Sequence, residues 1–241
     1  MTTPRRDYGA GVIAIKDATA KLESMAGVAA TSVGIGVPGS VDRKTGYISL
    51  GNSIWLNGKD LRADVETAVG VPIKIANDAN CFALSEAVDG AGKGGSVVFG
   101  AILGTGVGGG LAVNGKLIVG VNSIGGEWGH IPLPSPRDDE RPGRKWGWCK
   151  VGQTESWWSG PSFEADYARR AGIPIEGGPS VPDIMELVAA GDAIAEETFA
   201  RFEDRLARSL GSIINILDPD YIVFGGGVSN IDRLYETIPE L

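Results

Sequence analysis

A carboxylate stands where a predicted strand meets a predicted helix. Asp78 lies in the segment 77–80 (Asn-Asp-Ala-Asn), after the apolar residues 72–76 and before the helical pattern of residues 81–88. Open α/β sheets form their ligand crevice at the carboxyl ends of their strands, so Asp78 is a candidate base for removing a hydroxyl proton. The structural alternative is that Asp78 or Asn80 only caps the helix.

A second segment, residues 104–110 (Gly-Thr-Gly-Val-Gly-Gly-Gly), follows another apolar run. Its backbone N–H groups and the Thr105 hydroxyl can hydrogen-bond a polyphosphate without help from a lysine. The segment lacks the Gly-Lys-Ser/Thr end of a Walker loop, and it opens a hairpin rather than the helix of a dinucleotide fingerprint. The structural alternative is that these glycines serve a tight crossing of strands.

A third segment, residues 126–130 (Gly-Glu-Trp-Gly-His), carries two further polar groups. Glu127 and His130 are three residues apart, and together they can bind the vicinal hydroxyls of a sugar. His130 is the only histidine in the chain, and a lone histidine is more often a structural residue than a ligand. Asn52 and Trp55 can line the same cleft, although Trp55 also fits an ordinary core position.

The elements that must position these residues alternate between helix and strand. Helices are predicted for residues 17–25, 61–69, 81–88 and 192–217, and apolar residues at steps of three or four predict one apolar stripe on the last of them. Strands are predicted for residues 29–37, 72–76, 97–103 and 221–224, with a hairpin turn at Asn114-Gly115. This alternation predicts an α/β fold with a partly parallel sheet. The small, flexible residues 90–95 mark the expected boundary between an N-terminal lobe, 1–95, and a C-terminal lobe, 96–241.

Composition narrows the class of protein. The 241 residues are 43% hydrophobic, which is enough for a substantial core, and the net charge is −8. No run of lysine and arginine could track a nucleic-acid backbone, and no window approaches the roughly 20 apolar residues of a membrane span. Two widely spaced cysteines fit a reducing compartment, so we expect a cytoplasmic protein without disulfides.

Taken in order, the glycine-rich and polar segments resemble the ROK family of sugar kinases and repressors. The segments that carry the resemblance are residues 34–39, 77–80, 104–110, 126–130 and 225–227. Longer stretches, 77–90, 138–142 and 217–235, resemble the bacterial fructokinase (mannofructokinase) branch. The resemblance covers nearly the whole chain and implies an actin-like, ribonuclease H-like fold of two lobes.

The resemblance also implies a reaction and a set of site residues. The family transfers the γ-phosphate of Mg-ATP to a hexose hydroxyl, with fructose the expected hexose here and mannose or glucose as alternatives, and its kinases are commonly dimers, so a homodimer is possible. Asp78 would be the general base, and one aspartate with amide donors and a magnesium ion is sufficient for phosphoryl transfer. The sugar contacts would be Asn77, Glu127, His130 and Glu155, with Asn52 in the same cleft. The nucleotide contacts would be Thr105, Gly106, Gly225, Gly226 and Gly227.

Two departures from the family pattern bear on activity. The family's first strand and its Asp-x-Gly-Gly-Thr phosphate loop are absent, so we expect an incomplete N-terminal lobe and weak or no kinase activity for residues 1–241. The family's three zinc-binding cysteines correspond to Trp146, Trp148 and Gln153, with Cys149 one residue out of register. His130 alone matches a family zinc ligand, so we expect no structural zinc.

Two alternatives to a hexose kinase stay open. One is a sugar-binding ROK protein with impaired catalysis, which would keep the polar residues but not turn over. The other is the effector domain of a ROK repressor, although the chain shows neither a helix-turn-helix nor a basic face.

Overall fold

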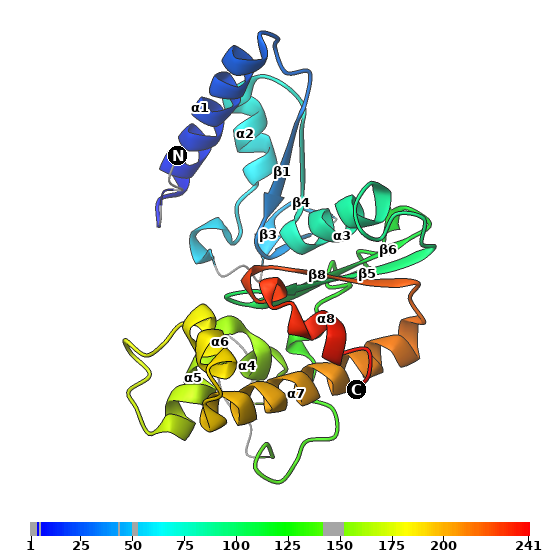
Figure 1. The fold of residues 1–241 in the computed structure, drawn as a ribbon. Helices are drawn as coiled ribbons and strands as arrows, with labels where there is room; N and C mark the ends of the chain where they lie inside the picture. Colours follow the sequence, from blue (N-terminus) through cyan, green and yellow to red (C-terminus); the bar gives the residue numbers. More distant parts are fainter. Residues whose placement is uncertain (1–3, 5, 43, 50–52, 142–151) are drawn as a thin grey trace. The chain divides into compact units, whose positions relative to one another are not determined.

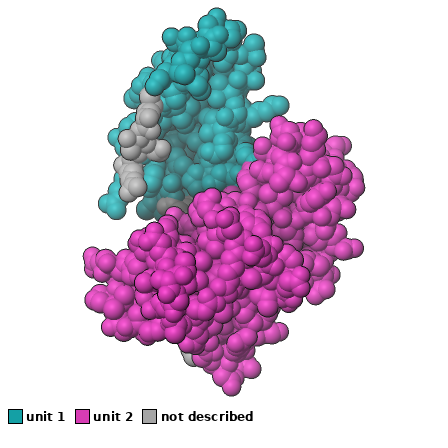
Figure 2. Space-filling model, in the orientation of Figure 1, with its two compact units in different colours: residues 1–81, 119–125 teal, residues 82–118, 126–241 magenta. Residues whose placement is uncertain are grey.

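The computed structural model describes residues 4, 6–42, 44–49, 53–141 and 152–241, and the chain divides into two compact units. Unit 1 consists of residues 1–81 and 119–125, and unit 2 of residues 82–118 and 126–241 (Figure 2). Each unit has an apolar core of its own. The boundary between an N-terminal lobe, 1–95, and a C-terminal lobe, 96–241, stays a prediction.

Unit 1 is built on two parallel strands (Figure 1). Its elements are α1 (Tyr8–Ala26), β1 (Val33–Val37), β2 (Ser40–Val41), β3 (Ile48–Ser49), the 3₁₀ turn η1 (Ile54–Leu56), α2 (Leu61–Val69) and β4 (Ile73–Asn77). β1 and β4 run in the same direction with Val37 opposite Asn77, so both strands end at one edge of the sheet. The buried core residues are Val37, Ile48, Leu61, Val65 and Ile73.

Helix α1 is longer than the sequence pattern predicted. It begins at Tyr8 rather than at residue 17, and the Asp7 side chain caps it by accepting a hydrogen bond from the Ala10 amide. Tyr8, Val12 and Ile15 pack against the core of unit 1, and this tertiary contact stabilises a first half that glycines weaken.

Unit 2 is built on a four-stranded sheet of order β7-β6-β5-β8. Its strands are β5 (Val97–Leu103), β6 (Val107–Val113), β7 (Lys116–Leu117) and β8 (Tyr221–Gly225). β5 is antiparallel to β6 and parallel to β8. Asn114 and Gly115 have φ angles of 50° and 68°, which confirms the predicted turn of the β6–β7 hairpin.

Most of the helices in the described residues belong to unit 2 (Figure 1). They are α3 (Asp78–Val88), which begins in unit 1, the 3₁₀ turn η2 (Trp128–His130), α4 (Glu155–Trp158), α5 (Gly160–Ala171), α6 (Val181–Ala189), α7 (Ala193–Leu217), the 3₁₀ turn η3 (Gly227–Asn230) and α8 (Arg233–Thr237). None of the helices in the described ranges is long and apolar enough to cross a membrane.

The long helix α7 carries the apolar stripe that its sequence predicted. Phe199, Phe202, Leu206 and Leu210 are all buried, and they pack on the face of the sheet that bears Phe99. On the other face, α3 approaches the sheet so closely that a Cβ on Gly100 would lie 2.9 Å from the Ala83 side chain. Burial on both faces explains why β5 is almost continuously apolar.

Candidate functional site

Asn77 and Asp78, at the junction of β4 and α3, make different hydrogen bonds. Asn77 caps α3, because its side-chain oxygen accepts a hydrogen bond from the Asn80 amide at 3.0 Å. Its Nδ2 donates to the Gly39 carbonyl at 2.9 Å and to Asp78 Oδ1 at 3.2 Å. Asp78 Oδ1 also accepts from the Ala79 amide at 2.9 Å.

Asp78 is therefore an exposed carboxylate in the first turn of a helix, and capping does not require it. The positive end of the helix dipole stabilises its negative charge. Partial burial and the charge of Asp78 both raise the pKa of the neighbouring Cys81 thiol, so this thiol is neutral at pH 7. The capping alternative raised by the sequence applies to Asn77 rather than to Asp78 or Asn80.

The glycine segment 104–110 divides into a turn and a strand. Only residues 104–106 form a turn, whereas Gly108, Gly109 and Gly110 lie within β6. A Cβ on Gly109 would lie 2.8 Å from both the Gly126 carbonyl oxygen and the Trp128 ring. The expectation of a single amide loop was therefore too broad, because the later glycines let the neighbouring segment approach the strand.

Two glycine turns lie together at the carboxyl ends of β5 and β8. Gly226 has a φ angle of 88°, and a Cβ there would lie 2.4 Å from the Leu103 carbonyl oxygen. The 104–106 turn, with the exposed Thr105, follows β5. Gly226 and Gly227 follow β8, whose last residue is Gly225. Backbone N–H groups of this kind, at the ends of parallel strands, form the crevice in which α/β proteins bind phosphates.

Glu127 and His130 face each other in the turn that leads into η2. The Glu127 carboxylate lies 3.7 Å from His130 Nε2, and His130 is exposed. Trp128 anchors the turn, since its indole nitrogen donates to the Gly108 carbonyl at 2.7 Å and its side chain is buried. The sequence prediction that these two side chains act together is consistent with this geometry.

Glu155 joins this group from helix α4. Its Oε2 accepts a hydrogen bond from the Val107 amide at 2.8 Å, directly after the 104–106 turn. A Cβ on Gly106 would lie 2.9 Å from the same oxygen, so the glycine leaves room for the carboxylate. The Thr154 hydroxyl donates to the Trp128 carbonyl at 2.7 Å, which ties α4 to the turn that carries Glu127 and His130.

The structure describes only part of the segment 146–155, in which zinc ligands were sought. Trp146, Trp148 and Cys149 lie outside the described residues, so the expectation of no structural zinc stays a prediction. Gln153 is described, and its Nε2 donates to the His130 carbonyl at 2.6 Å. A hydrogen bond thus joins these two positions directly. The described residues contain no group of three or more side chains suited to a metal ion.

The predicted site residues fall into two groups. Unit 1 carries Asn77 and Asp78, whereas unit 2 carries Thr105, Gly106, Glu127, His130, Glu155 and Gly225–Gly227. Asn52 lies outside the described residues. The assigned roles of these residues stay predictions. Within unit 2, hydrogen bonds connect the turn of Glu127 and His130 to β6 and to α4, which carries Glu155.

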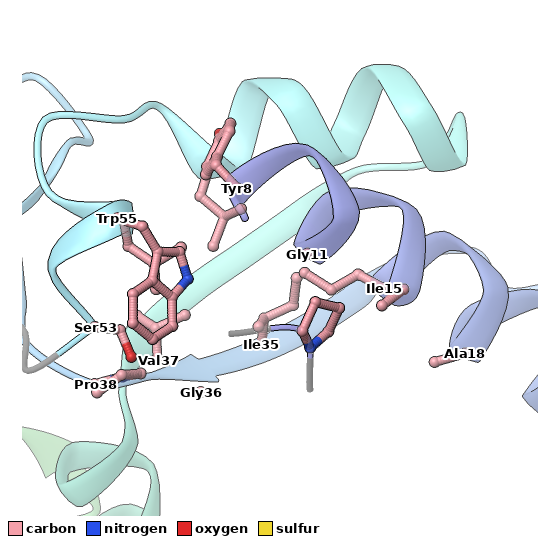
Figure 3. Close-up of a pocket in the computed structure, with 14 residues that line it drawn as sticks. Tyr8, Gly11, Ile15, Ala18, Ile35, Gly36, Val37, Pro38, Ser53 and Trp55 are labelled. Atoms are coloured by element: carbon pink, nitrogen blue, oxygen red, sulfur yellow. The ribbon is translucent and has the colours of Figure 1, made fainter. Parts of the chain in front are cut away.

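Unit 1 also contains a largely apolar pocket of about 530 Å³ (Figure 3). Ile15 of α1, Val37 of β1 and Trp55 of η1 contribute to its wall. Trp55 is half-buried here, and Asp78 is not among the lining residues. Its apolar lining does not resemble the polar surroundings of a phosphoryl-transfer site.

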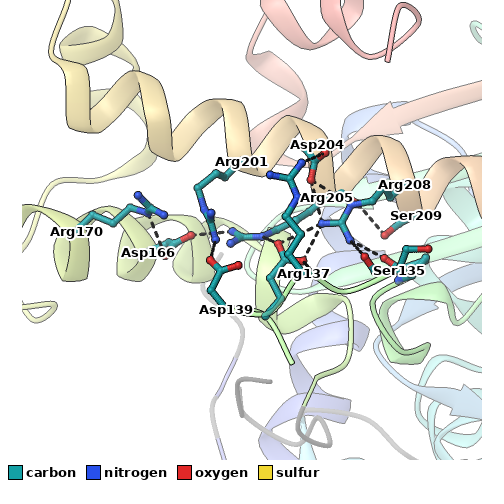
Figure 4. Close-up of polar contacts among 12 residues, drawn as sticks. Ser135, Arg137, Asp139, Asp166, Arg170, Arg201, Asp204, Arg205, Arg208 and Ser209 are labelled. Atoms are coloured by element: carbon teal, nitrogen blue, oxygen red, sulfur yellow. Dashed lines mark hydrogen bonds and ion pairs between the residues drawn. The ribbon is translucent and has the colours of Figure 1, made fainter. Parts of the chain in front are cut away.

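The sequence interpretation missed a cluster of arginines and carboxylates in unit 2 (Figure 4). Arg205 is buried in α7, where it binds Glu140 and Asp166. Burial alone would raise the pKa of Glu140, but the Arg137 amide and the Arg205 and Arg208 guanidinium groups lower it to about 2. Arginines at positions 201, 205 and 208 share one face of α7, a spacing that the sequence does display.

Comparison with known proteins connects this geometry to a family. The ROK family matches residues 1–241. The N-acetyl-D-glucosamine kinase of Pectobacterium atrosepticum is 39% identical over 243 residues, covering 99% of this chain and 78% of that protein. The corresponding kinase of Citrobacter koseri is 40% identical over 238 residues, covering 97% of this chain and 77% of that protein.

Solved structures agree with the sequence relatives. The ROK hexokinase from Thermus thermophilus has a TM-score of 0.84 and 28% identity, covering 100% of this chain and 78% of that one. A ROK family glucokinase from Streptomyces griseus, in complex with glucose and AMPPNP, has a TM-score of 0.81 and 29% identity with the same coverage.

These comparisons confirm the predicted family and its α/β sugar kinase fold. They do not support the fructokinase branch, because the two sequence relatives reported above are named N-acetyl-D-glucosamine kinase and the two solved structures are a hexokinase and a glucokinase. With a family match over the whole chain and relatives near 40% identity, this chain belongs to the ROK family and is a sugar kinase.

Proposed function

We propose that this chain binds a hexose and ATP and transfers the γ-phosphate to a sugar hydroxyl, with N-acetyl-D-glucosamine as the first candidate substrate. The names of relatives that are 38–40% identical support this choice of sugar. Fructose, which the sequence resemblance favoured, is the competing candidate.

The observation that carries the proposal is that the Asp78 carboxylate is exposed and is not needed as a helix cap. Its carboxylate is exposed at the start of α3, and the neighbouring Asn77 performs the capping. A base in this position can accept the hydroxyl proton as the oxygen attacks the phosphorus. The hydrogen bond from Asn77 Nδ2 to Asp78 Oδ1 would orient the carboxylate, and a direct sugar contact by Asn77 stays a prediction.

The sugar contacts in unit 2 would come from Glu127, His130 and Glu155. Two carboxylates and an imidazole supply the acceptors and donors that a polyhydroxylated ring needs. Trp128 and Thr154, which hold the segments that carry these side chains, are buried. This burial favours a preorganised site over one that forms on binding.

The nucleotide phosphates would lie against the turns that contain Thr105, Gly106 and Gly226. The close approach of Gly226 to β5 leaves no room for a side chain, and the exposed amides suit phosphate oxygens. Mg²⁺ would enter with the nucleotide and neutralise phosphate charge, because such sites bind it largely through phosphate oxygens and water.

Substitution of the proposed base tests the reaction. Asp78→Asn should keep hexose and ATP-analogue affinity within about twofold but lower the rate of phosphoryl transfer by about 10²- to 10⁴-fold. Asp89→Asn, which removes an exposed carboxylate just beyond the other end of α3, is the matched control and should leave the rate unchanged. Equal rates in Asp78→Asn and the unmodified chain would refute the assignment.

Sugar preference is a separate measurement. Isothermal titration with N-acetyl-D-glucosamine, glucose, mannose and fructose gives dissociation constants without requiring turnover. Tightest binding of N-acetyl-D-glucosamine supports the proposed substrate, whereas tightest binding of fructose would reverse it in favour of the fructokinase branch.

A further inference from the structure

The arginine cluster of unit 2 has a buried centre. The Arg205 side chain is 1% exposed, and its two carboxylate partners, Glu140 and Asp166, are 1% and 4% exposed. Arginine is seldom buried this deeply unless paired, and breaking such a pair is costly. The cluster is therefore a fixed part of unit 2 rather than a set of mobile surface charges.

Arg205 joins elements that are far apart in the sequence. Its Nε donates to Glu140 Oε1 at 2.8 Å, in the loop that follows η2, and its Nη1 donates to Asp166 Oδ2 at 2.7 Å, in α5. Figure 4 shows the guanidinium of Arg205 between these elements. Arg208 adds a second clamp on the same loop, donating to Glu140 and to the Pro134 carbonyl.

The guanidinium of Arg205 also lies over an aromatic ring. Its Cζ lies 4.7 Å from the ring centroid of Trp157, which is 1% exposed. Arg205 Nη2 is buried and has no hydrogen-bond partner in the described part of the chain. Cation–π contacts of this type are stronger when both partners are desolvated.

Trp157 belongs to a helix that cannot fix its own position. Helix α4 has four residues, Glu155–Trp158, and one helical turn is unstable without tertiary support. Support comes from Trp158, which packs edge-on against Trp128 with 4.3 Å between the ring centroids. It also comes from Trp157, which packs against Arg205. Glu155, at the start of this turn, holds the Val107 amide at 2.8 Å.

We propose that Arg205 is a positioning residue for the hexose site: held by Glu140 and Asp166, it fixes Trp157 and thereby places the Glu155 carboxylate against β6. The sugar-binding part of this inference rests on the proposed function, whereas the placement of Glu155 does not. The ligands recognised through Glu155 would be vicinal hydroxyls, which accept or donate hydrogen bonds over a narrow range of geometry.

The substitution Arg205→Lys tests the role of the planar group. Lysine keeps the charge but loses the fork that reaches two carboxylates and the planar group that lies over the Trp157 ring. Arg170→Lys is the matched control, because Arg170 also neighbours Asp166 but donates to the exposed Glu197. A folded Arg205→Lys protein is verified by circular dichroism before the measurements.

The first readout needs no ligand. Hydrogen exchange of the Val107 amide, followed by NMR, reports on its hydrogen bond to Glu155. We expect exchange to be faster by about tenfold or more in Arg205→Lys, with no such change in Arg170→Lys. Unchanged protection of Val107 in Arg205→Lys would overturn the proposal. Should the unmodified chain bind no hexose, faster exchange would still support the placement of Glu155 while the proposed function failed.

The second readout separates positioning from stability. The dissociation constant for N-acetyl-D-glucosamine should rise on the order of tenfold in Arg205→Lys, as expected for a misplaced binding group. In a Glu155→Gln background the same substitution should change it by less than about twofold. An equal loss of affinity in both backgrounds would show that Arg205 acts only on overall stability and would refute its role through Glu155.

Discussion

Replacing Glu140 by glutamine removes the carboxylate that two guanidinium groups share. Glu140 accepts hydrogen bonds from Arg205 at 2.8 Å, from Arg208 at 3.0 Å and from the Arg137 amide at 2.9 Å. Its pKa falls from an ordinary 4.5 to about 2, which corresponds to about 3 kcal/mol of stability. The side chain is 1% exposed, so little of this value is lost to solvent screening.

The sign of the pH dependence follows from the lowered pKa. The contribution of Glu140 is fully present above pH 4.5 and is lost as the pH falls toward 2, because the unfolded chain protonates first. By pH 3 about 2 kcal/mol of it should be gone. At pH 7 we expect Glu140→Gln to lower the free energy of unfolding by about 3 kcal/mol, and at pH 3 by only about 1 kcal/mol.

Urea unfolding followed by tryptophan fluorescence at pH 7, 5, 4 and 3 measures this difference. A Trp55→Phe background leaves all remaining tryptophans within the sequence of unit 2, so the signal reports that unit. Glu197→Gln is the control, because Glu197 pairs with Arg170 while 66% exposed and should contribute less than about 1 kcal/mol. A difference for Glu140→Gln that is constant across this pH range would refute the reasoning.

Two other substitutions test the glycine turn and the helix cap. Gly226→Ala should destabilise unit 2 by at least about 2 kcal/mol, since its φ of 88° disfavours a side chain and the new Cβ would lie 2.4 Å from a β5 carbonyl oxygen. Gly227→Ala, which meets no atom within 4 Å, is the control for thermal unfolding. Asn77→Ala should cost about 1 to 2 kcal/mol through loss of the α3 cap, and an unchanged urea midpoint would contradict that role.

The elements that the sequence predicted best are those whose local pattern agrees with their packing. Helix α2 and strand β5 have the predicted bounds, Leu61–Val69 and Val97–Leu103. The first half of α1 was missed because Gly9 and Gly11 lower its helix propensity, and only packing against unit 1 offsets that cost. Propensity is a local quantity, whereas this helix depends on contacts distant in the sequence.

In the candidate site, too, residue type and spacing predicted some features, whereas others depend on contacts distant in the sequence. Asp78, Glu127 and His130 could be proposed from residue type and spacing, since each stands beside a glycine or a strand end. Spacing could not separate the turn at residues 104–106 from strand β6, because glycine is compatible with both conformations. The reason for Gly109 becomes visible only when Trp128, 19 residues later, is found against it.

The arginines of α7 were missed for a different reason. A charged face on a long helix is usually solvated, and the sequence contains nothing that says Arg205 is buried. Its partners come from a loop and from α5, so the charges cancel only in three dimensions. An amphipathic pattern therefore predicted the apolar stripe of α7 correctly but not the second buried face beside it.

The glycines of β6 and the arginines of α7 act on the same short segments. Small residues in β6 let Trp128 approach the strand, which sets the turn of Glu127 and His130, whereas Arg205 supports α4 from its other side. Both supports meet at Thr154, whose hydroxyl bonds the Trp128 carbonyl. Because the two supports share this connection, a change in one alters the geometry on which the other acts. Substitutions at Gly109 and Arg205 should therefore combine non-additively in sugar affinity, although their contributions to unfolding arise from different contacts.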